Sequence, residues 1–190
     1  MDKDTITVVS GLPRSGTSMM MKMLEAGGME LLTDNQRTAD EDNPKGYYEF
    51  EKVKELDKEH SWLASSQGKV VKIISALLEK LPRDYSYKIL FMQRNIQEIL
   101  ASQKQMLVRR GEPTDTISDE KMAEHFSRHL KRVETWLEQQ PNIDVTYVHY
   151  NEVLKNPADS IKKINAFLDH SLDEQNMAKV VDQALYRQRK

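Results

Sequence analysis

The sequence contains no cysteine, so it offers neither a disulfide framework nor a thiolate for catalysis. No apolar run approaches the roughly 20 residues that a membrane-spanning helix needs, and we expect no membrane insertion. None of the five histidines forms an H-x-x-x-H pair in a context that strongly favours metal binding, so we expect no metal. A net charge of −2 provides no excess of positive charge, and we therefore expect no nucleic-acid partner.

The start of the chain also lacks the basic and apolar stretches of a signal peptide. It is acidic and leads directly into an apolar segment, so we expect a cytoplasmic protein. A length of 190 residues and a hydrophobic content of 38% suit one globular domain over residues 1–190. Composition gives no indication of the oligomeric state.

The most informative stretch covers residues 5–28, where a strand, a glycine-bounded loop and a helix follow one another. Residues 6–9 are apolar and mostly β-branched, which is typical of a buried strand. Residues 19–26 have a helical composition, and the Gly-Gly pair after them ends the helix. This arrangement presents backbone N–H groups and a helix N-terminus to an anion.

The loop nearly matches the nucleotide-binding pattern G-x-x-x-x-G-K-[ST]. Gly11, Gly16 and Ser18 occupy the required positions, but Thr17 stands where the lysine should be. Because that lysine reaches the outer phosphates of a nucleoside triphosphate, its absence argues against ordinary ATP or GTP hydrolysis. Arg14 offers a cation from inside the loop instead. The alternative is a strand, turn and helix in which the glycines only shape the turn.

The loop Pro-Arg-Ser-Gly-Thr-Ser resembles the 5′-phosphosulfate loop of sulfotransferases, especially of the tyrosylprotein and carbohydrate branches. These enzymes use 3′-phosphoadenosine 5′-phosphosulfate (PAPS), share the P-loop fold with kinases, and lack the lysine at this position. The resemblance implies that PAPS is the co-substrate. It also implies a set of binding residues within the loop, namely Pro13, Arg14, Ser15, Gly16, Thr17 and Ser18.

The rest of the chain alternates between strand and helix patterns. We expect further strands over 69–74, 87–92 and 145–149, and helices over 51–64, 76–81, 96–110, 118–140, 157–168 and 173–185. Ser75 and Ser118 are placed to cap two of these helices. Such alternation predicts an α/β protein, a three-layer P-loop fold with a mostly parallel central sheet flanked by helices. Ligands then bind beyond the carboxyl ends of the strands.

A second match to the family lies after the strand over 87–92. Arg94 follows that strand and Ser102 comes eight residues later, on the expected helix. Sulfotransferases hold the 3′-phosphate of PAPS with an arginine and a serine at this spacing, so the resemblance implies the same role here. Arginine suits it, because its planar fork matches phosphate oxygens. Alone, the two residues would be an ordinary surface charge and a neutral helix residue.

A third match covers the late strand and helix, with Asn156-Pro157 followed by a Phe-Leu pair at 167–168. In the family an aromatic residue at the start of this segment lies near the adenine. Tyr150 is the candidate, although a tyrosine at a strand end is also a common core or rim residue.

Sulfuryl transfer also needs a second cation and a base that takes the acceptor's proton. Lys72 resembles a cation of several branches, with a solvent-facing lysine as the alternative. The histidine that cytosolic members use as base is missing after the strand over 69–74. We choose Glu49, since similar small bacterial proteins carry a like Gly-aromatic-aromatic-Glu segment. Asp34 is the rival, and either carboxylate could simply face solvent.

Together these features predict a PAPS-dependent sulfotransferase with catalytic residues Arg14, Glu49 and Lys72. The acceptor, a hydroxyl or an amine, is not readable from the sequence. The polar segments 34–45 and 111–116 are expected to act as lids. The alternatives are a kinase or NTPase that uses Mg-ATP, and a nucleotide-binding protein without turnover.

Overall fold

The computed structural model describes residues 4–34, 46–114 and 116–181. Five strands form a sheet in the order β2-β3-β1-β4-β5, and every neighbouring pair is parallel. The strands are β1 (Thr5–Gly11), β2 (Leu31–Leu32), β3 (Val70–Lys72), β4 (Ser86–Gln93) and β5 (Ile143–His149). The central strands β1, β3 and β4 are largely buried and rich in apolar residues, as parallel strands covered on both faces should be. The predicted α/β class with a mostly parallel sheet is confirmed.

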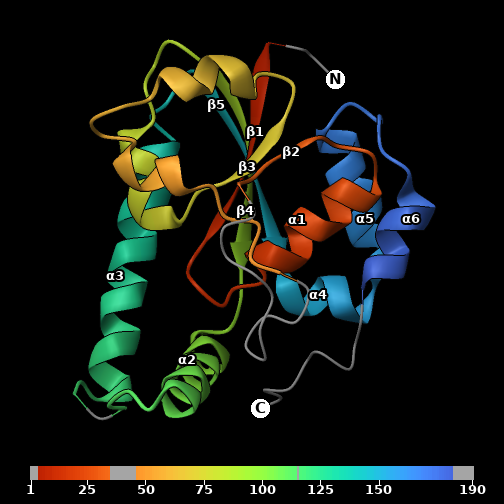
Figure 1. The fold of residues 1–190 in the computed structure, drawn as a ribbon. Helices are drawn as coiled ribbons and strands as arrows, with labels where there is room; N and C mark the ends of the chain where they lie inside the picture. The colour runs from red at the N-terminus through yellow and green to blue at the C-terminus, as the bar shows by residue number, and fades with distance from the viewer. Residues whose placement is uncertain (1–3, 35–45, 115, 182–190) are drawn as a thin grey trace.

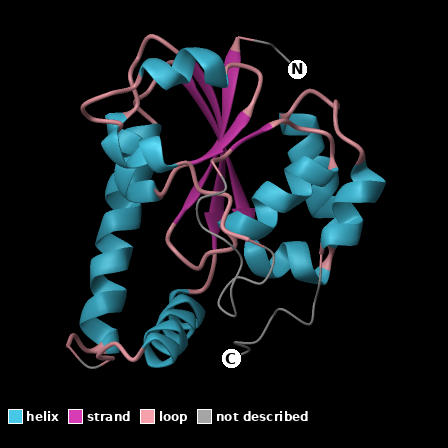
Figure 2. Ribbon diagram, viewed as in Figure 1, coloured by secondary structure: helices cyan, strands magenta, loops and turns pink. Residues whose placement is uncertain are grey.

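Two layers of helices cover the sheet (Figures 1 and 2). One layer contains α1 (Thr17–Ala26), α4 (Tyr150–Lys155), α5 (Pro157–Phe167) and α6 (Glu174–Val180). The opposite layer contains α3 (Asp119–Leu137) and three 3₁₀-helices, which are η1 (Glu51–Glu55), η2 (Ser61–Ser66) and η3 (Ser75–Lys80). Each layer has its own cluster of buried apolar side chains against the sheet. The remaining helix, α2 (Ile96–Arg110), lies beyond the carboxyl end of β4 (Figure 1).

The single helix predicted over 51–64 was wrong, because the chain forms η1 and η2 there. Val53 and Leu56 are both buried, and a spacing of three residues suits the three-residue turn of a 3₁₀-helix. The side chain of Glu59 accepts a hydrogen bond from the backbone N–H of Ser61, 2.7 Å away, at the residue where η2 begins.

Ser75 does not cap a helix as predicted, since Ile74 precedes η3 and no side chain caps it among the described residues. The hydroxyl of Ser75 instead meets His129 of α3. The short helix α4 was also missed, because its residues follow a strand directly and resemble a strand end. By contrast, α2 has the predicted bounds, and Ser118 caps α3 as expected.

Most of the predicted polar segment over 34–45 lies outside the described residues, as does the end of the last predicted helix beyond residue 181. Where the chain is described, none of its helices combines the length and the apolar character required to cross a membrane.

Candidate functional site

The loop between β1 and α1 is built around two glycines that tolerate no side chain. Gly11 has φ 145°, and a Cβ there would lie 2.5 Å from Ser15 Oγ and 2.6 Å from the carbonyl oxygen of Met92. Gly16 has φ 103°, and a Cβ there would lie 2.4 Å from the ring of Tyr150. Both φ values belong to conformations that side-chain-bearing residues rarely adopt. The glycines therefore fix the loop and also let β4 and α4 approach it.

Arg14 also has a left-handed backbone, with φ 73°, which is uncommon for a residue other than glycine. Its Nε donates a hydrogen bond to Ser102 Oγ on α2, at 2.9 Å. Strain of this kind is held in place by surrounding contacts and gathers at functional sites. The cation of the loop thus reaches one of the two residues predicted to hold the 3′-phosphate.

Arg94, the other predicted phosphate residue, lies against the same loop. Its Nη1 donates to the carbonyl oxygen of Arg14 at 3.1 Å, and its Nε donates to Glu98 at 2.9 Å. The guanidinium lies over the ring of Tyr150, 4.4 Å from the ring centroid, at a distance typical of cation–π contact. The fold therefore brings Arg14, Arg94, Ser102 and Tyr150 into one cluster.

The remaining loop residues surround the N-terminus of α1. Pro13 is exposed on the outer side of the loop, whereas Ser15 is buried. Within the described chain the Ser15 hydroxyl has no hydrogen-bond partner, which is rare for a buried polar group and favours a role in ligand binding. Gly16 precedes α1, Thr17 begins it, and no side chain within the described residues caps this helix. Its first N–H groups are therefore suited to an anion.

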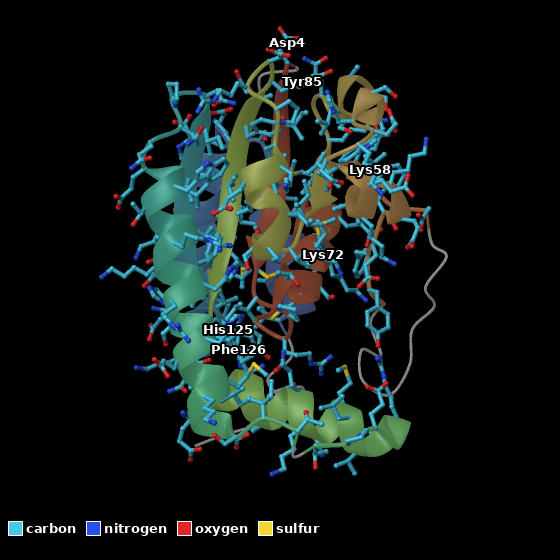
Figure 3. All side chains as sticks on the ribbon, turned by 90° about the vertical axis from the view of Figure 1, so that its left-hand side faces the viewer. Asp4, Lys58, Lys72, Tyr85, His125 and Phe126 are labelled. Atoms are coloured by element: carbon cyan, nitrogen blue, oxygen red, sulfur yellow. The ribbon has the colours of Figure 1, made fainter. Side chains whose placement is uncertain are left out.

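A second group of polar side chains lies at the end of β3. Lys72 is 7% exposed and lies near the middle of the molecule (Figure 3). Its ammonium donates a hydrogen bond to the carbonyl oxygen of Tyr47 and lies 3.5 Å from a carboxylate oxygen of Glu49. Ser18 of α1 donates to the same Tyr47 carbonyl at 3.5 Å. Lys72 is therefore not the solvent-facing lysine of the alternative, and segment 46–50 joins β3 to the first turn of α1.

The two candidate bases have different surroundings. Glu49 is 32% exposed beside Lys72, so its carboxylate is accessible and next to a cation. Asp34 Oδ2 accepts a hydrogen bond from the backbone N–H of Glu51, 2.6 Å away at the start of η1. That contact gives Asp34 a structural task, because it satisfies an N–H group of a helix start.

Sequence reasoning missed a histidine at this end of the sheet. Ser75 lies three residues after Lys72, and its Oγ is 2.9 Å from Nε2 of His129, which belongs to α3. Burial lowers the pKa of His129, and the nearby positive charge of Arg132 lowers it further, so the neutral ring is favoured. Ser75 alone gave no signal of this pair, because a serine before a helix is typical of a cap. Sequence reasoning also gave no role to Glu98.

A cavity of about 590 Å³ opens beside the cluster at the carboxyl ends of β4 and β5. Ser15 and Arg94 line it, together with apolar side chains that include Ile99 and Leu130. In the described parts of the chain, no three His, Cys, Asp or Glu side chains are grouped so that they could hold a metal ion.

Tyr150 is the first residue of α4 rather than the last of a strand, and it is only 7% exposed. Its ring contacts the Arg94 guanidinium and would meet any side chain at position 16. These contacts give it a supporting role in the cluster. Its predicted contact with adenine stays a prediction.

The chain was compared with known protein families, curated proteins and solved structures. The profile of the sulfotransferase domain matches residues 4–190. A relative, mouse sulfotransferase 1B1, is 34% identical over 56 residues, which are 30% of this chain and 19% of that protein. The matched segment is therefore a small part of that curated relative.

Two solved structures share the fold. Mouse sulfotransferase SULT7A1 complexed with PAP has a TM-score of 0.52 at 20% identity, over 96% of this chain and 64% of that one. Sulfotransferase STF9 from Mycobacterium avium has a TM-score of 0.59 at 12% identity, over 100% of this chain and 70% of that one. At these identities the likeness concerns the fold. Because the domain profile covers nearly the whole sequence, this chain belongs to the sulfotransferase family.

Proposed function

We propose that this protein transfers the sulfuryl group of PAPS to an acceptor hydroxyl or amine and releases 3′,5′-ADP. The observation that carries this proposal is the link between a lysine-free phosphate loop and the pair formed by Arg94 and Ser102. Arg14 donates to Ser102, and Arg94 donates to the backbone of Arg14. A nucleotide with phosphates at both its 5′ and 3′ positions fits two such sites side by side. A fold relative bound to PAP supports the same reading.

The residues present fit this co-substrate. The buried Ser15 hydroxyl has no partner in the described chain, and the N-terminus of α1 has no side-chain cap there. These groups can donate to the 5′-phosphosulfate, together with the backbone N–H groups of the loop from Arg14 to Ser18.

Arg94 and Ser102 would hold the 3′-phosphate through charge-assisted hydrogen bonds. Tyr150 would contact the adenosine through the edge of its ring, since its face lies under Arg94.

The reaction needs the residues at both ends of the site. PAPS supplies the sulfuryl group, whose bond to the bridging phosphate oxygen breaks as a bond from the acceptor atom to sulfur forms. Arg14 and Lys72 would stabilise the negative charge that develops on the leaving phosphate, as preorganised cations do in phosphoryl transfer. No step requires a metal-bound group.

Glu49 would take the proton that the acceptor loses. Its carboxylate is accessible, and Lys72 lies 3.5 Å away and orients it. Asp34 is the weaker candidate, because its side chain is engaged with the backbone of Glu51. His129 beside Ser75 is a third proton acceptor near the end of β3, and its lowered pKa keeps the ring neutral.

The competing function is a kinase or NTPase that uses Mg-ATP. It would require a cation at the position of Thr17 and an acidic residue at a strand end to hold Mg²⁺. The strand β4 ends Met92-Gln93, so it offers no carboxylate there.

Thermal unfolding with added nucleotides separates the two functions. We expect 3′,5′-ADP to raise the melting temperature without any metal, because a ligand at 100 times its Kd adds about 2.7 kcal/mol to the free energy of unfolding. ADP and Mg-ATP should raise it much less. A clear shift with Mg-ATP and none with 3′,5′-ADP would contradict the proposed function.

A further inference from the structure

Glu98 is a buried carboxylate inside a site that we propose for a phosphate. It lies on the first turn of α2 and its side chain is 2% exposed. Oε2 accepts a hydrogen bond from Arg94 Nε at 2.9 Å, and Oε1 accepts one from Asn151 Nδ2, also at 2.9 Å. Both oxygens of the carboxylate therefore have defined partners on different elements, one at the end of β4 and the other on α4.

A buried negative charge beside a phosphate site is unfavourable for both folding and phosphate binding. It must be desolvated, and it repels the anion that the site binds. An ion pair with Arg94 offsets the cost of burial, but it also draws on the positive charge that the phosphate needs. Charge alone therefore predicts that removal of Glu98 should tighten the binding of a 3′-phosphate.

The geometry gives the carboxylate a different effect. Arg94 contacts Glu98 through Nε and the Arg14 carbonyl through Nη1, and its face lies on Tyr150. Three contacts in different directions fix the plane of a guanidinium, which is otherwise at the end of a flexible side chain. The fork of an arginine recognises phosphate only when that plane is oriented, because its N–H groups point in fixed directions.

We propose that Glu98 is a positioning residue for the 3′-phosphate: it holds the Arg94 guanidinium in the plane that the phosphate requires. Through Asn151 it also ties that orientation to α4, which carries Tyr150. The inference rests on the proposed function of Arg94. If Glu98 has this role, the preference for nucleotides with a 3′-phosphate depends on a residue that does not contact the nucleotide.

The test compares the affinities of 3′,5′-ADP and 5′-AMP in Glu98→Gln. The amide keeps the shape of the side chain but places an NH₂ group against a donor, either Arg94 Nε or Asn151 Nδ2. We expect 3′,5′-ADP to bind about ten- to a hundredfold more weakly, the size of one charge-assisted hydrogen bond, while 5′-AMP changes little. Asn151→Ala, which keeps the charge and removes one contact, should give a smaller loss in the same direction.

Glu98→Asp restores the charge on a shorter side chain and should recover part of the loss. Glu124→Gln is the matched control, since it removes one carboxylate from an exposed position on α3 where its partner is Arg128. Calorimetry supplies both affinities, and the melting temperature of each variant shows whether it is folded. Equal losses for 3′,5′-ADP and 5′-AMP would show a merely structural role and overturn the inference.

The outcome also separates this inference from the proposed function. If Arg94→Ala lowers the preference for 3′,5′-ADP while Glu98→Gln leaves it unchanged or raises it, the positioning role is wrong and the phosphate role of Arg94 stands. If Arg94→Ala leaves the preference unchanged, the proposed 3′-phosphate site itself is wrong.

Discussion

The two ends of the proposed site, one for the nucleotide and one for sulfuryl transfer, are built in different ways. At the nucleotide end, Arg14 comes from a glycine-bounded loop, Arg94 follows β4 and Ser102 lies in the second turn of α2, and hydrogen bonds of 2.9 and 3.1 Å join them through Arg14. At the transfer end, Glu49 is 32% exposed on a segment without regular structure, and its contact with Lys72 is 3.5 Å long. The nucleotide end is therefore organised by partly buried hydrogen bonds that join the loop after β1 to the end of β4 and to α2. The transfer end depends on one buried lysine and an accessible carboxylate.

This difference has a physical reason. Phosphates have fixed geometry, so donors that neighbouring groups hold in one orientation bind them best. An acceptor must enter and leave, which requires accessible groups on irregular backbone. Changes at the nucleotide end should therefore reduce binding and stability together, whereas changes at the transfer end should reduce turnover alone.

The largest expected effect comes from Gly16→Ala, which breaks the nucleotide end. The new Cβ would meet the Tyr150 ring at 2.4 Å in a backbone with φ 103°. Strain and overpacking together should lower the free energy of unfolding by about 2–6 kcal/mol and abolish 3′,5′-ADP binding. Chemical denaturation and calorimetry measure the two effects.

Gly28→Ala is the matched control for this change. Gly28 has a similar φ of 100°, but a Cβ there would have no atom within 4 Å. It should therefore show the cost of backbone strain alone and leave nucleotide binding intact. Equal losses of stability in the two variants would mean that the contact with Tyr150 has no importance.

The next effect is on turnover, and Glu49→Gln breaks the transfer end. The amide preserves shape and removes basicity, so the rate of sulfuryl transfer should fall by about 10²–10⁴ while 3′,5′-ADP still binds. Slow release of 3′,5′-ADP from PAPS is the first readout, followed by transfer to a panel of alcohols, phenols and amines. Asp34→Asn should be mild. A wild-type rate in Glu49→Gln would contradict the assignment of Glu49 as the base and leave Asp34 and His129 as the candidates.

A smaller effect sharpens the nucleotide end. Arg94→Ala should weaken 3′,5′-ADP by roughly 1.5–3 kcal/mol, because a charge-assisted contact to the 3′-phosphate is lost. Binding of 5′-AMP, which has no 3′-phosphate, should change little. Titration calorimetry with both nucleotides measures the difference, and parallel losses would mean that Arg94 acts only through the Arg14 backbone.

The smallest effect concerns pH and the pair formed by Ser75 and His129. The pKa of His129 is lowered in the folded protein from its ordinary value of 6.5, chiefly by burial. Between the lowered pKa and about pH 6.5 the unfolded chain therefore binds more protons at this residue than the folded protein does. The contribution of His129 to the free energy of unfolding is complete above about pH 6.5 and is lost as the pH falls through that range. We would measure the melting temperatures of wild type and His129→Gln between pH 7.5 and 5. The difference between them should be largest at neutral pH and should shrink as the pH falls. A constant gap would contradict this assignment.

Local pattern was enough to predict several elements. The bounds of α2 and the Ser118 cap of α3 both follow from residues within one or two turns. The same holds for the phosphate loop, because glycine spacing encodes the backbone conformations that the loop needs. Prediction failed over 51–64, where packing of Val53 and Trp62 on the sheet favours two short 3₁₀-helices.

By itself the sequence determined the α/β class, the conformation of the phosphate loop and the types of side chain available at the strand ends. Only the tertiary structure decided which of them meet across the chain: Arg14 with Ser102, Lys72 with Glu49, and Glu98 with Asn151. The reason is that backbone preference and hydrophobic periodicity act over a few residues. Arg14 meets Ser102 across 88 residues and Glu98 meets Asn151 across 53 because β4 pairs in parallel with both β1 and β5, which brings the carboxyl ends of all three strands to one edge of the sheet.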